Sequence, residues 1–209
     1  MSPRDEMVFV VDDDARVREA LGELLESLGW RAETFAAAAD YLAYAKPDLP
    51  ACLILDVELP GINGLELQKQ LSRDVHPPIV FLTGHDDIPS SVFATEDGTI
   101  GFLRKPVGEH DLVAAVRAAI DRDRVQRSAR EELAEFERRL AALTPQEREV
   151  VPLVVSGFLN KQAAAELGIS ESTVEMLRSE IMQKMQATSL ADLARIAESL
   201  HLPVIRSRR

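Results

Sequence analysis

The first 121 residues alternate short apolar runs with longer segments of helical periodicity, an order that few architectures accommodate. The apolar runs read MVFVV, RAETF, ACLILD, PIVFLTG and IGFLRKP. The helical segments read ARVREALGELLESLG, AADYLAYA, GLELQKQLSR and the stretch from Glu109 to about Asp121. Runs rich in β-branched residues favour strands, and apolar residues three and four apart favour helices. Five alternating units predict an α/β domain, a doubly wound parallel sheet of five strands with helices on both faces.

The pattern changes at Arg122, where a charged segment without glycine or proline begins, RDRVQRSAREELAEFERRLAAL. It predicts a helical linker over residues 122–142. Four apolar residues spaced three, four and three apart form a narrow seam: Leu133, Phe136, Leu140 and Leu143. Such a seam is typical of a helix that pairs with a second copy, and equally of one that packs on its own domains.

Residues 143–209 predict an all-α domain of four short helices. The expected N-caps are Thr144 with Glu147 as capping-box partner, then Asn160, then Ser170, and then Ser189 with Asp192. Gly157 and Gly168 are expected to end the first two helices. Pro152 lies inside the first and should kink it or sit near a break. The tight GIS turn between the second helix and the long third helix is typical of a helix-turn-helix.

Charge is distributed unevenly along the chain. Lys and Arg number 10 against 22 Asp and Glu in residues 1–121, 6 against 5 in residues 122–142, and 8 against 8 in residues 143–209. The near-neutral last part can therefore approach a polyanion with less repulsion than the acidic first part.

Composition also excludes two classes of protein. No apolar run approaches the roughly 20 residues that span a bilayer, and MSPRDEM lacks the layout of an export signal, so we expect a cytoplasmic protein without membrane contact. Cys52 is the only cysteine, which excludes an intramolecular disulfide, and its apolar surroundings predict a buried core residue.

Carboxylates gather where two of the predicted strands end. Asp12 and Asp13 follow the first strand, and Asp56 ends the third. Because the carboxyl ends of parallel strands meet at one edge of a sheet, we expect these side chains to lie close together. Neighbouring carboxylates repel one another unless a cation neutralises them, which predicts Mg²⁺, for which Mn²⁺ could substitute. The turn after Asp56 could leave the backbone carbonyl of Glu58 free as a further oxygen ligand.

Two more strands end in residues that can handle an anion. Thr83 ends the fourth strand, and Lys105, followed by Pro106, ends the fifth. Each residue alone is a weak indication, since threonine is common in strands and a terminal lysine is usually solvated. Their joint placement with the carboxylates, on four strands of one predicted sheet, indicates a functional edge.

With these residues in place, the segment from about Met7 to Asp121 resembles the receiver domain of bacterial two-component response regulators, a flavodoxin-like domain. VVDDD, LILDVELPGINGLEL, VFLTGHDDIP and FLRKP carry the resemblance. It implies that Asp56 accepts a phosphoryl group from a sensor histidine kinase. It also implies that Asp13, Asp56 and the Glu58 carbonyl hold Mg²⁺, with Asp12 assisting through water.

The resemblance implies further roles around the acceptor. Lys105 would pair with a phosphoryl oxygen, and the Thr83 hydroxyl would bond another. Thr83 and Phe102 would form the family's switch, with core packing as the alternative for Phe102, and Pro106 resembles the family's cis-proline. The face that responds is IPSSVFATEDGTIGF, which departs from related chains at Phe93 and EDGT. A homodimer that forms on phosphorylation is implied as well.

Residues from about Leu143 to Leu200 resemble the LuxR-type helix-turn-helix of NarL/FixJ regulators. The positions that fit are Glu147, Gly157, Asn160, Lys161, Ala164, Gly168, Ile169, Ser170, Thr173, Val174, Arg178 and Lys184. Helical periodicity predicts a buried face made of Val174, Leu177, Ile181 and Met185. The expected DNA contacts are Lys161, Ser172, Thr173, Glu175, Met176, Arg178, Ser179 and Lys184, and Gln183 also faces outward. Where the family usually carries a lysine and, two places later, a histidine, this chain has Glu175 and Leu177.

Three functions follow from these features. The leading one is a response regulator that binds promoter DNA when phosphorylated, with RNA polymerase as a further partner. The second is a phosphatase of the haloacid-dehalogenase type, suggested by DDDAR, although that family expects Gly-Thr where this chain has Ala15 and Arg16. The third is a signalling protein that acts through protein contacts with weak or lost DNA binding, because Glu175 adds repulsion from the DNA backbone.

Overall fold

The computed structural model describes residues 5–61, 64–71, 75–84, 99–203 and 205. The chain divides into two compact units, Met1–Arg127 and Ser128–Arg209. Within the described residues, no helix combines the length and the apolar character needed to cross a bilayer.

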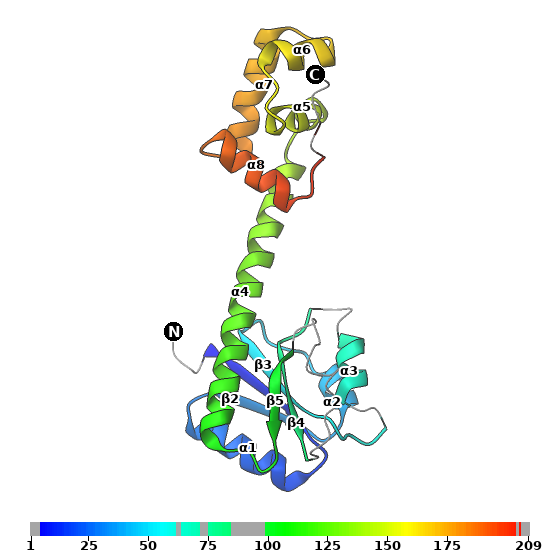
Figure 1. Cartoon of the computed structure of the whole chain (residues 1–209), viewed down its shortest axis with the longest axis vertical. Coiled ribbons are helices and arrows are strands. Elements are labelled where there is room, and N and C mark those ends of the chain that lie inside the picture. Colours follow the sequence, from blue (N-terminus) through cyan, green and yellow to red (C-terminus); the bar gives the residue numbers. More distant parts are fainter. Residues whose placement is uncertain (1–4, 62–63, 72–74, 85–98, 204, 206–209) are drawn as a thin grey trace. The chain divides into compact units, whose positions relative to one another are not determined.

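The first unit is built on a sheet of five parallel strands, as predicted. The strands are β1 (Met7–Val11), β2 (Arg31–Phe35), β3 (Ala51–Asp56), β4 (Ile79–Thr83) and β5 (Thr99–Arg104). They lie in the order β2-β1-β3-β4-β5 (Figure 1). Every residue of β1, β3 and β4 is buried, because helices cover both faces of the sheet.

Among the residues described in the first unit, four helices accompany the sheet. They are α1 (Ala15–Ser27), α2 (Ala38–Ala43), α3 (Gly64–Leu71) and α4 (Glu109–Ala141). The side chains of α1 and α4 pack on one face of the sheet with Cys52, which is fully buried as expected, and those of α2 and α3 pack on the other. Burial raises the pKa of the Cys52 thiol. The predicted responding face, residues 88–102, lies outside the described residues up to position 98, Phe93 included, and its end forms β5.

The predicted helix from Glu109 and the predicted linker form one continuous helix, α4. The first turns of that linker belong to the first unit. Asp123, fully buried, accepts hydrogen bonds from the Ala51 backbone N–H at 2.8 Å and from Arg127 Nε at 2.8 Å. Arg124 forms an ion pair with Glu6, whose carboxylate also accepts from Trp30 Nε1 at 2.6 Å.

Most of the apolar seam of the linker packs in the core of the second unit. Phe136 and Leu143 are buried in the core of the second unit, and Leu140 packs against them, whereas Leu133 is exposed. The guanidinium of Arg195 lies 5.5 Å from the Phe136 ring centroid, and its Nη1 donates to Glu132 at 3.0 Å. The end of α4 is thereby an integral part of the second unit.

The second unit adds four helices, which matches the prediction. They are α5 (Pro145–Val155), α6 (Asn160–Leu167), α7 (Glu171–Lys184) and α8 (Leu190–Ser199). The capping box of Thr144 and Glu147 is confirmed, with reciprocal bonds of 3.3 and 2.7 Å. Ser170 and Ser189 also cap their helices as predicted.

Two predicted caps were wrong in detail. Asn160 is the first residue of α6 rather than its cap, because the Leu159 N–H donates to Gln162 Oε1 at 2.8 Å and the helix therefore starts from Leu159. Asp192 does not complete a box with Ser189. Its carboxylate accepts instead from the Thr188 N–H at 2.9 Å, which extends the cap one residue back along the chain.

Pro152 is accommodated because it lies in the last turn of α5. The helix continues only to Val155. The Pro152 carbonyl accepts from Ser156, through the backbone N–H at 3.2 Å and through Oγ at 2.6 Å. Gly157 then adopts a φ of 81°, a left-handed conformation that ends the helix at little cost for glycine, and Gly168 ends α6 in the same way with a φ of 66°.

Candidate functional site

The predicted carboxylates converge at the carboxyl edge of the sheet. Asp12 and Asp13 follow β1, and Asp56 ends β3, the strand paired with β1. Ligand oxygens of the three side chains lie within 4.8 Å of one another. Asp12 and Asp56 are buried, whereas Asp13 is exposed. The cluster therefore opens to solvent on the side of Asp13.

Backbone contacts hold the two buried carboxylates in place. Asp12 Oδ1 accepts from the Asp14 N–H at 2.9 Å, and Asp56 Oδ1 accepts from the Glu58 N–H at 3.0 Å. The turn after β3 needs a glycine at its end, because a Cβ at Gly64 would lie 2.3 Å from the Asp56 carbonyl oxygen. In both carboxylates the second oxygen, Oδ2, remains available for a contact with Lys105.

Lys105 supplies the cation of the site. Its Nζ lies 2.6 Å from Asp12 Oδ2 and 2.7 Å from Asp56 Oδ2. The lysine is placed at the end of β5 by a backbone bond to the Thr83 carbonyl at 2.9 Å, and the peptide bond to Pro106 is cis. Lys105 thus contacts two of the three clustered carboxylates.

Burial is the largest single influence on the pKa values of Asp12 and Lys105. Burial raises the pKa of Asp12, the nearby charge of Asp56 adds to the effect, and the Lys105 and Asp14 hydrogen bonds oppose it. Burial alone would lower the pKa of Lys105, but the hydrogen bonds to Asp12 and Asp56 outweigh it and raise that pKa. A hard divalent cation fits such a donor set, because it would neutralise carboxylates that the single lysine does not.

Of the two predicted switch residues, Thr83 lies at the carboxyl edge of the sheet and Phe102 lies two positions before the end of β5. Thr83 ends β4 and is buried, directly after Leu82, which pairs with Asp56 in the sheet. Phe102 on β5 is half-buried and stacks on Phe81, with ring centroids 5.1 Å apart. The ring also packs against the core on the α2 and α3 face of the sheet.

One residue of the site had no signal in the sequence. Arg18, on α1, donates from Nη1 to the Asp12 carbonyl at 2.7 Å. This bond ties the helix to the loop that carries the carboxylates. An arginine in the first turns of a helix is ordinarily solvated, so its partner becomes evident only in three dimensions.

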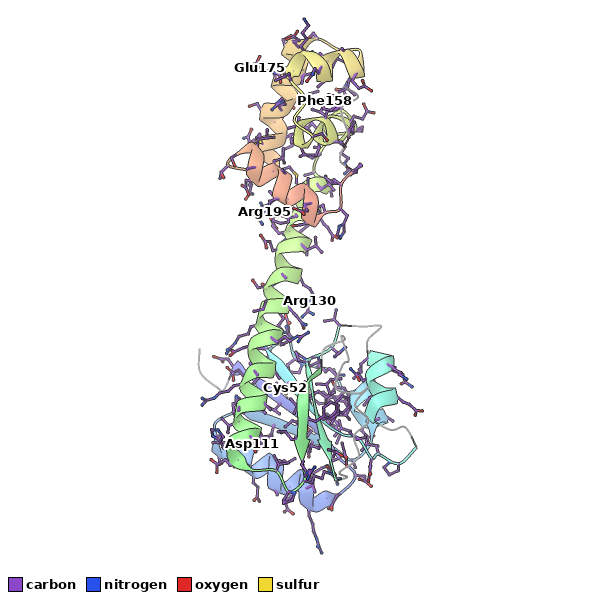
Figure 2. The ribbon with its side chains drawn as sticks, viewed as in Figure 1. Cys52, Asp111, Arg130, Phe158, Glu175 and Arg195 are labelled. Atoms are coloured by element: carbon purple, nitrogen blue, oxygen red, sulfur yellow. The ribbon has the colours of Figure 1, made fainter. Side chains whose placement is uncertain are left out.

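In the second unit, α7 has the two faces that its periodicity predicts. Val174, Leu177, Ile181 and Met185 are buried. Ser172, Glu175, Met176, Ser179 and Gln183 are exposed, and Figure 2 marks Glu175 on this helix. Thr173 is half-buried, and its hydroxyl lies 2.7 Å from Ser170 Oγ in the cap of the helix.

The structure separates the three cations expected to bind DNA phosphates. Lys161 and Arg178 line one concavity of about 560 Å³ with Phe158, and Arg178 Nη1 donates to the Phe158 carbonyl at 3.1 Å. Lys184 lies elsewhere, because its Nζ contacts both oxygens of the fully buried Glu147 at 2.6 and 2.8 Å. A buried carboxylate needs a cation, so Lys184 has a partner within its own unit in addition to the DNA phosphate that the sequence predicts for it.

Comparison with known proteins identifies the family. Residues 8–117 match the model of the response regulator receiver domain, and residues 141–197 match that of the bacterial regulatory proteins of the luxR family. The chain belongs to the response regulators. Both matches favour the leading interpretation over the phosphatase alternative.

Full-length relatives share this arrangement. Nodulation protein W of Bradyrhizobium diazoefficiens is 45% identical over 93% of this chain and 86% of that protein. Transcriptional regulatory protein FixJ of Azorhizobium caulinodans is 41% identical over 93% of each. The solved structure of response regulator StyR is similar with a TM-score of 0.79 and 44% identity, covering 93% of this chain and 98% of that one. This response regulator therefore combines a receiver domain with a LuxR-type DNA-binding domain, as transcriptional relatives do.

Proposed function

We propose that this response regulator accepts a phosphoryl group on Asp56 and that the modification controls its binding to promoter DNA. The observation that carries the proposal is the Asp56 carboxylate at the end of β3, 2.7 Å from Lys105 Nζ and clustered with Asp12 and Asp13. The proposed receiver domain spans residues 1–121, the linker 122–142 and the DNA-binding domain 143–209.

The chemistry assigns a role to each residue of the edge. An Asp56 oxygen attacks the phosphorus of a phosphohistidine on the sensor kinase, a P–O bond forms, and the P–N bond breaks. The released imidazole keeps the electron pair and takes a proton from solvent. Asp13, Asp56 and the Glu58 carbonyl would hold Mg²⁺, with Asp12 acting through water. The bound ion would neutralise charge on the transferring group.

The remaining residues would bind the acyl phosphate, which water would later hydrolyse. Lys105 would contact one phosphoryl oxygen and the Thr83 hydroxyl another. Water that attacks the phosphorus returns Asp56 to a free carboxylate and releases inorganic phosphate, so the protein would limit the lifetime of its own signal. Movement of Thr83 would shift the population of Phe102 positions, the switch that the family resemblance implies.

The output would be transcriptional. We propose that α7 enters a major groove, that Lys161 and Arg178 contact phosphates, and that Ser172, Glu175, Met176 and Ser179 face the bases. Thr173 would support the start of the helix. Because promoter DNA and RNA polymerase are the proposed partners, the protein would act in the cytoplasm, as a homodimer once phosphorylated.

A second candidate function is signalling through protein contacts without useful DNA affinity. Two observations favour it. Glu175 places a negative charge on the exposed face of α7, and the ammonium of Lys184 is bound to Glu147. Both reduce the attraction of this helix for a polyanion.

Phosphorylation is tested by incubating the full chain with Mg²⁺ and acetyl phosphate and recording the intact mass. We expect one stable phosphoryl group on the wild type and none on Asp56→Asn. Asp40→Asn, an exposed aspartate of α2, is the matched control and should be modified like the wild type. Continuous release of phosphate without a retained group would indicate a phosphatase instead.

DNA binding is tested by selection from a random duplex library at increasing salt. The proposal predicts an enriched sequence that is bound more tightly after phosphorylation. Failure to enrich any sequence, even at low salt and with phosphorylated protein, would support the candidate that acts through protein contacts alone.

A further inference from the structure

The outward face of α7 is acidic. Six side chains of this helix are exposed: Glu171, Ser172, Glu175, Met176, Ser179 and Gln183. Four of them are neutral, Glu171 is the first residue of the helix, and Glu175 is the one acidic side chain among the exposed residues that follow it. Figure 2 shows Glu175 near the start of α7, the part of a recognition helix that contacts base edges in helix-turn-helix proteins.

The cations of α7 do not neutralise this carboxylate. Arg178, one turn further along, donates to the Phe158 carbonyl, and Lys184 is bound to Glu147. Glu171, one turn before, is also acidic. Among the residues that the structure describes, Glu175 therefore has neither an ion pair nor a hydrogen-bonding partner, and its two oxygens can only accept hydrogen bonds.

We infer that Glu175 determines base specificity by accepting a hydrogen bond from the N4 amino group of a cytosine in the major groove. The inference rests on the proposed DNA binding and names the base that the bound protein would recognise. A carboxylate beside DNA is repelled by the phosphates unless a donor meets it, and only the amino groups of cytosine and adenine are donors in this groove.

Cytosine fits the carboxylate better than adenine does. The adenine amino group lies beside N7, an acceptor whose lone pair would face the second carboxylate oxygen. The cytosine amino group lies beside a C–H group and presents no such acceptor. Guanine and thymine offer only acceptors at the corresponding positions, so both would repel Glu175.

The experiment compares selections with the phosphorylated full chain as wild type, Glu175→Gln and Glu175→Lys. Wild type should enrich cytosine at one position of each half-site. Glutamine should shift that position to adenine, whose N6 and N7 it can engage together, and lysine should shift it to guanine. Glu198→Gln, which makes the same change of charge at an exposed position of α8, should enrich the wild-type sequence.

A modified base isolates the proposed hydrogen bond. Replacing the selected cytosine by 2-pyrimidinone removes the amino group and leaves the ring. We expect wild-type affinity to fall about fivefold, the lower end for a specific base contact. Glu175→Ala should bind the two duplexes equally well, since it has no acceptor to lose.

The outcomes separate this inference from the function on which it rests. Enrichment of the same base by wild type, Glu175→Gln and Glu175→Lys would overturn the inference while DNA binding stood. Enrichment by Glu175→Lys alone would overturn it too, because Glu175 would then block binding rather than read a base. If no variant enriched any sequence, the proposed DNA binding itself would fail.

Discussion

Two lysines of this response regulator bind buried carboxylates, one in each unit, and the two contacts differ in charge balance. Lys105 meets Asp12 and Asp56 while exposed Asp13 adds a third carboxylate, so the first site keeps a surplus of negative charge. Lys184 pairs with Glu147, whose carboxylate also accepts from the Thr144 N–H and has the Glu180 side chain as a further hydrogen-bonding partner.

The pKa values of Asp12 and Glu147 shift in opposite directions. Burial raises the pKa of Asp12 despite its hydrogen bonds. Burial acts to raise the pKa of Glu147 as well, but the hydrogen bonds from Lys184, Thr144 and Glu180 prevail and lower it to about 2. A balanced contact of this kind stabilises a fold, whereas an unbalanced one leaves room for a further cation. The geometry of a lysine and a carboxylate alone does not separate the two cases.

The largest effect should come from Lys184→Met. Removing the lysine would leave the Glu147 charge buried without a cation, which costs about 3–5 kcal/mol of unfolding free energy. Glu147→Gln should cost less, because Lys184 is 36% exposed and can turn to water. Unfolding in urea followed by circular dichroism reports both units, while fluorescence of the single tryptophan, Trp30, reports the first unit alone.

The control for this change is Lys161→Met, an exposed lysine of α6. It should alter stability by no more than about 0.5 kcal/mol, as surface substitutions ordinarily do. If Lys184→Met instead unfolded like the wild type and lost DNA affinity, Lys184 would be a phosphate contact, as the sequence first indicated.

Lys105→Met should show the opposite response to cations. Without Mg²⁺, losing the only ammonium of the cluster should destabilise the first unit by about 2 kcal/mol, since a partly open site leaves less unpaired charge than Glu147 would carry. Adding Mg²⁺ should restore most of that loss, measured by Trp30 fluorescence. Lys184→Met should gain nothing from Mg²⁺, and equal rescue of both variants would contradict the proposed contrast.

The first site was predictable because the topology of the parallel sheet brings its residues together. Asp56 and Thr83 end β3 and β4, Lys105 directly follows β5, and parallel strands bring their carboxyl ends to one edge whatever the details of packing. The same argument requires no knowledge of loops. Arg18 was not predictable in this way, since its bond to the Asp12 carbonyl depends on where α1 lies above the loop.

The second contact was missed for a different reason. Glu147 was correctly assigned to a capping box, Lys184 was expected to contact DNA, and each role looked complete by itself. The two residues lie 37 positions apart, and only the packing of α7 against α5 shows that one carboxylate serves both contacts. Asp123 is similar, because nothing in a charged helix marks one aspartate as buried.

A smaller effect is expected from Mg²⁺ on the wild type. An ion that binds the folded first unit at ten times its dissociation constant should stabilise that unit by about 1.4 kcal/mol. The Trp30 transition should therefore move to higher urea. Asp13→Asn should abolish the shift, while Asp14→Asn, next to it in sequence and equally exposed, should retain it. A similar shift in the second unit would mean that the ion acts without a specific site.

The smallest expected effect is the loss of stability of the second unit in acid that Glu147 causes. The pKa of Glu147 is lowered on folding from 4.5 to about 2, so its contribution is complete above the unfolded value and is lost as the pH falls toward the folded one. From about pH 5 to about pH 4 the carboxylate stays ionised in the folded state and starts to protonate in the unfolded state. The second unit should lose about 0.7 kcal/mol over that interval through this group. Glu147→Gln should remove that share of the pH dependence, measured by circular dichroism, whereas Glu198→Gln should keep it. An unchanged slope in Glu147→Gln would show that other carboxylates of the second unit govern its response to acid and that Glu147 and Lys184 are not the balanced pair inferred here.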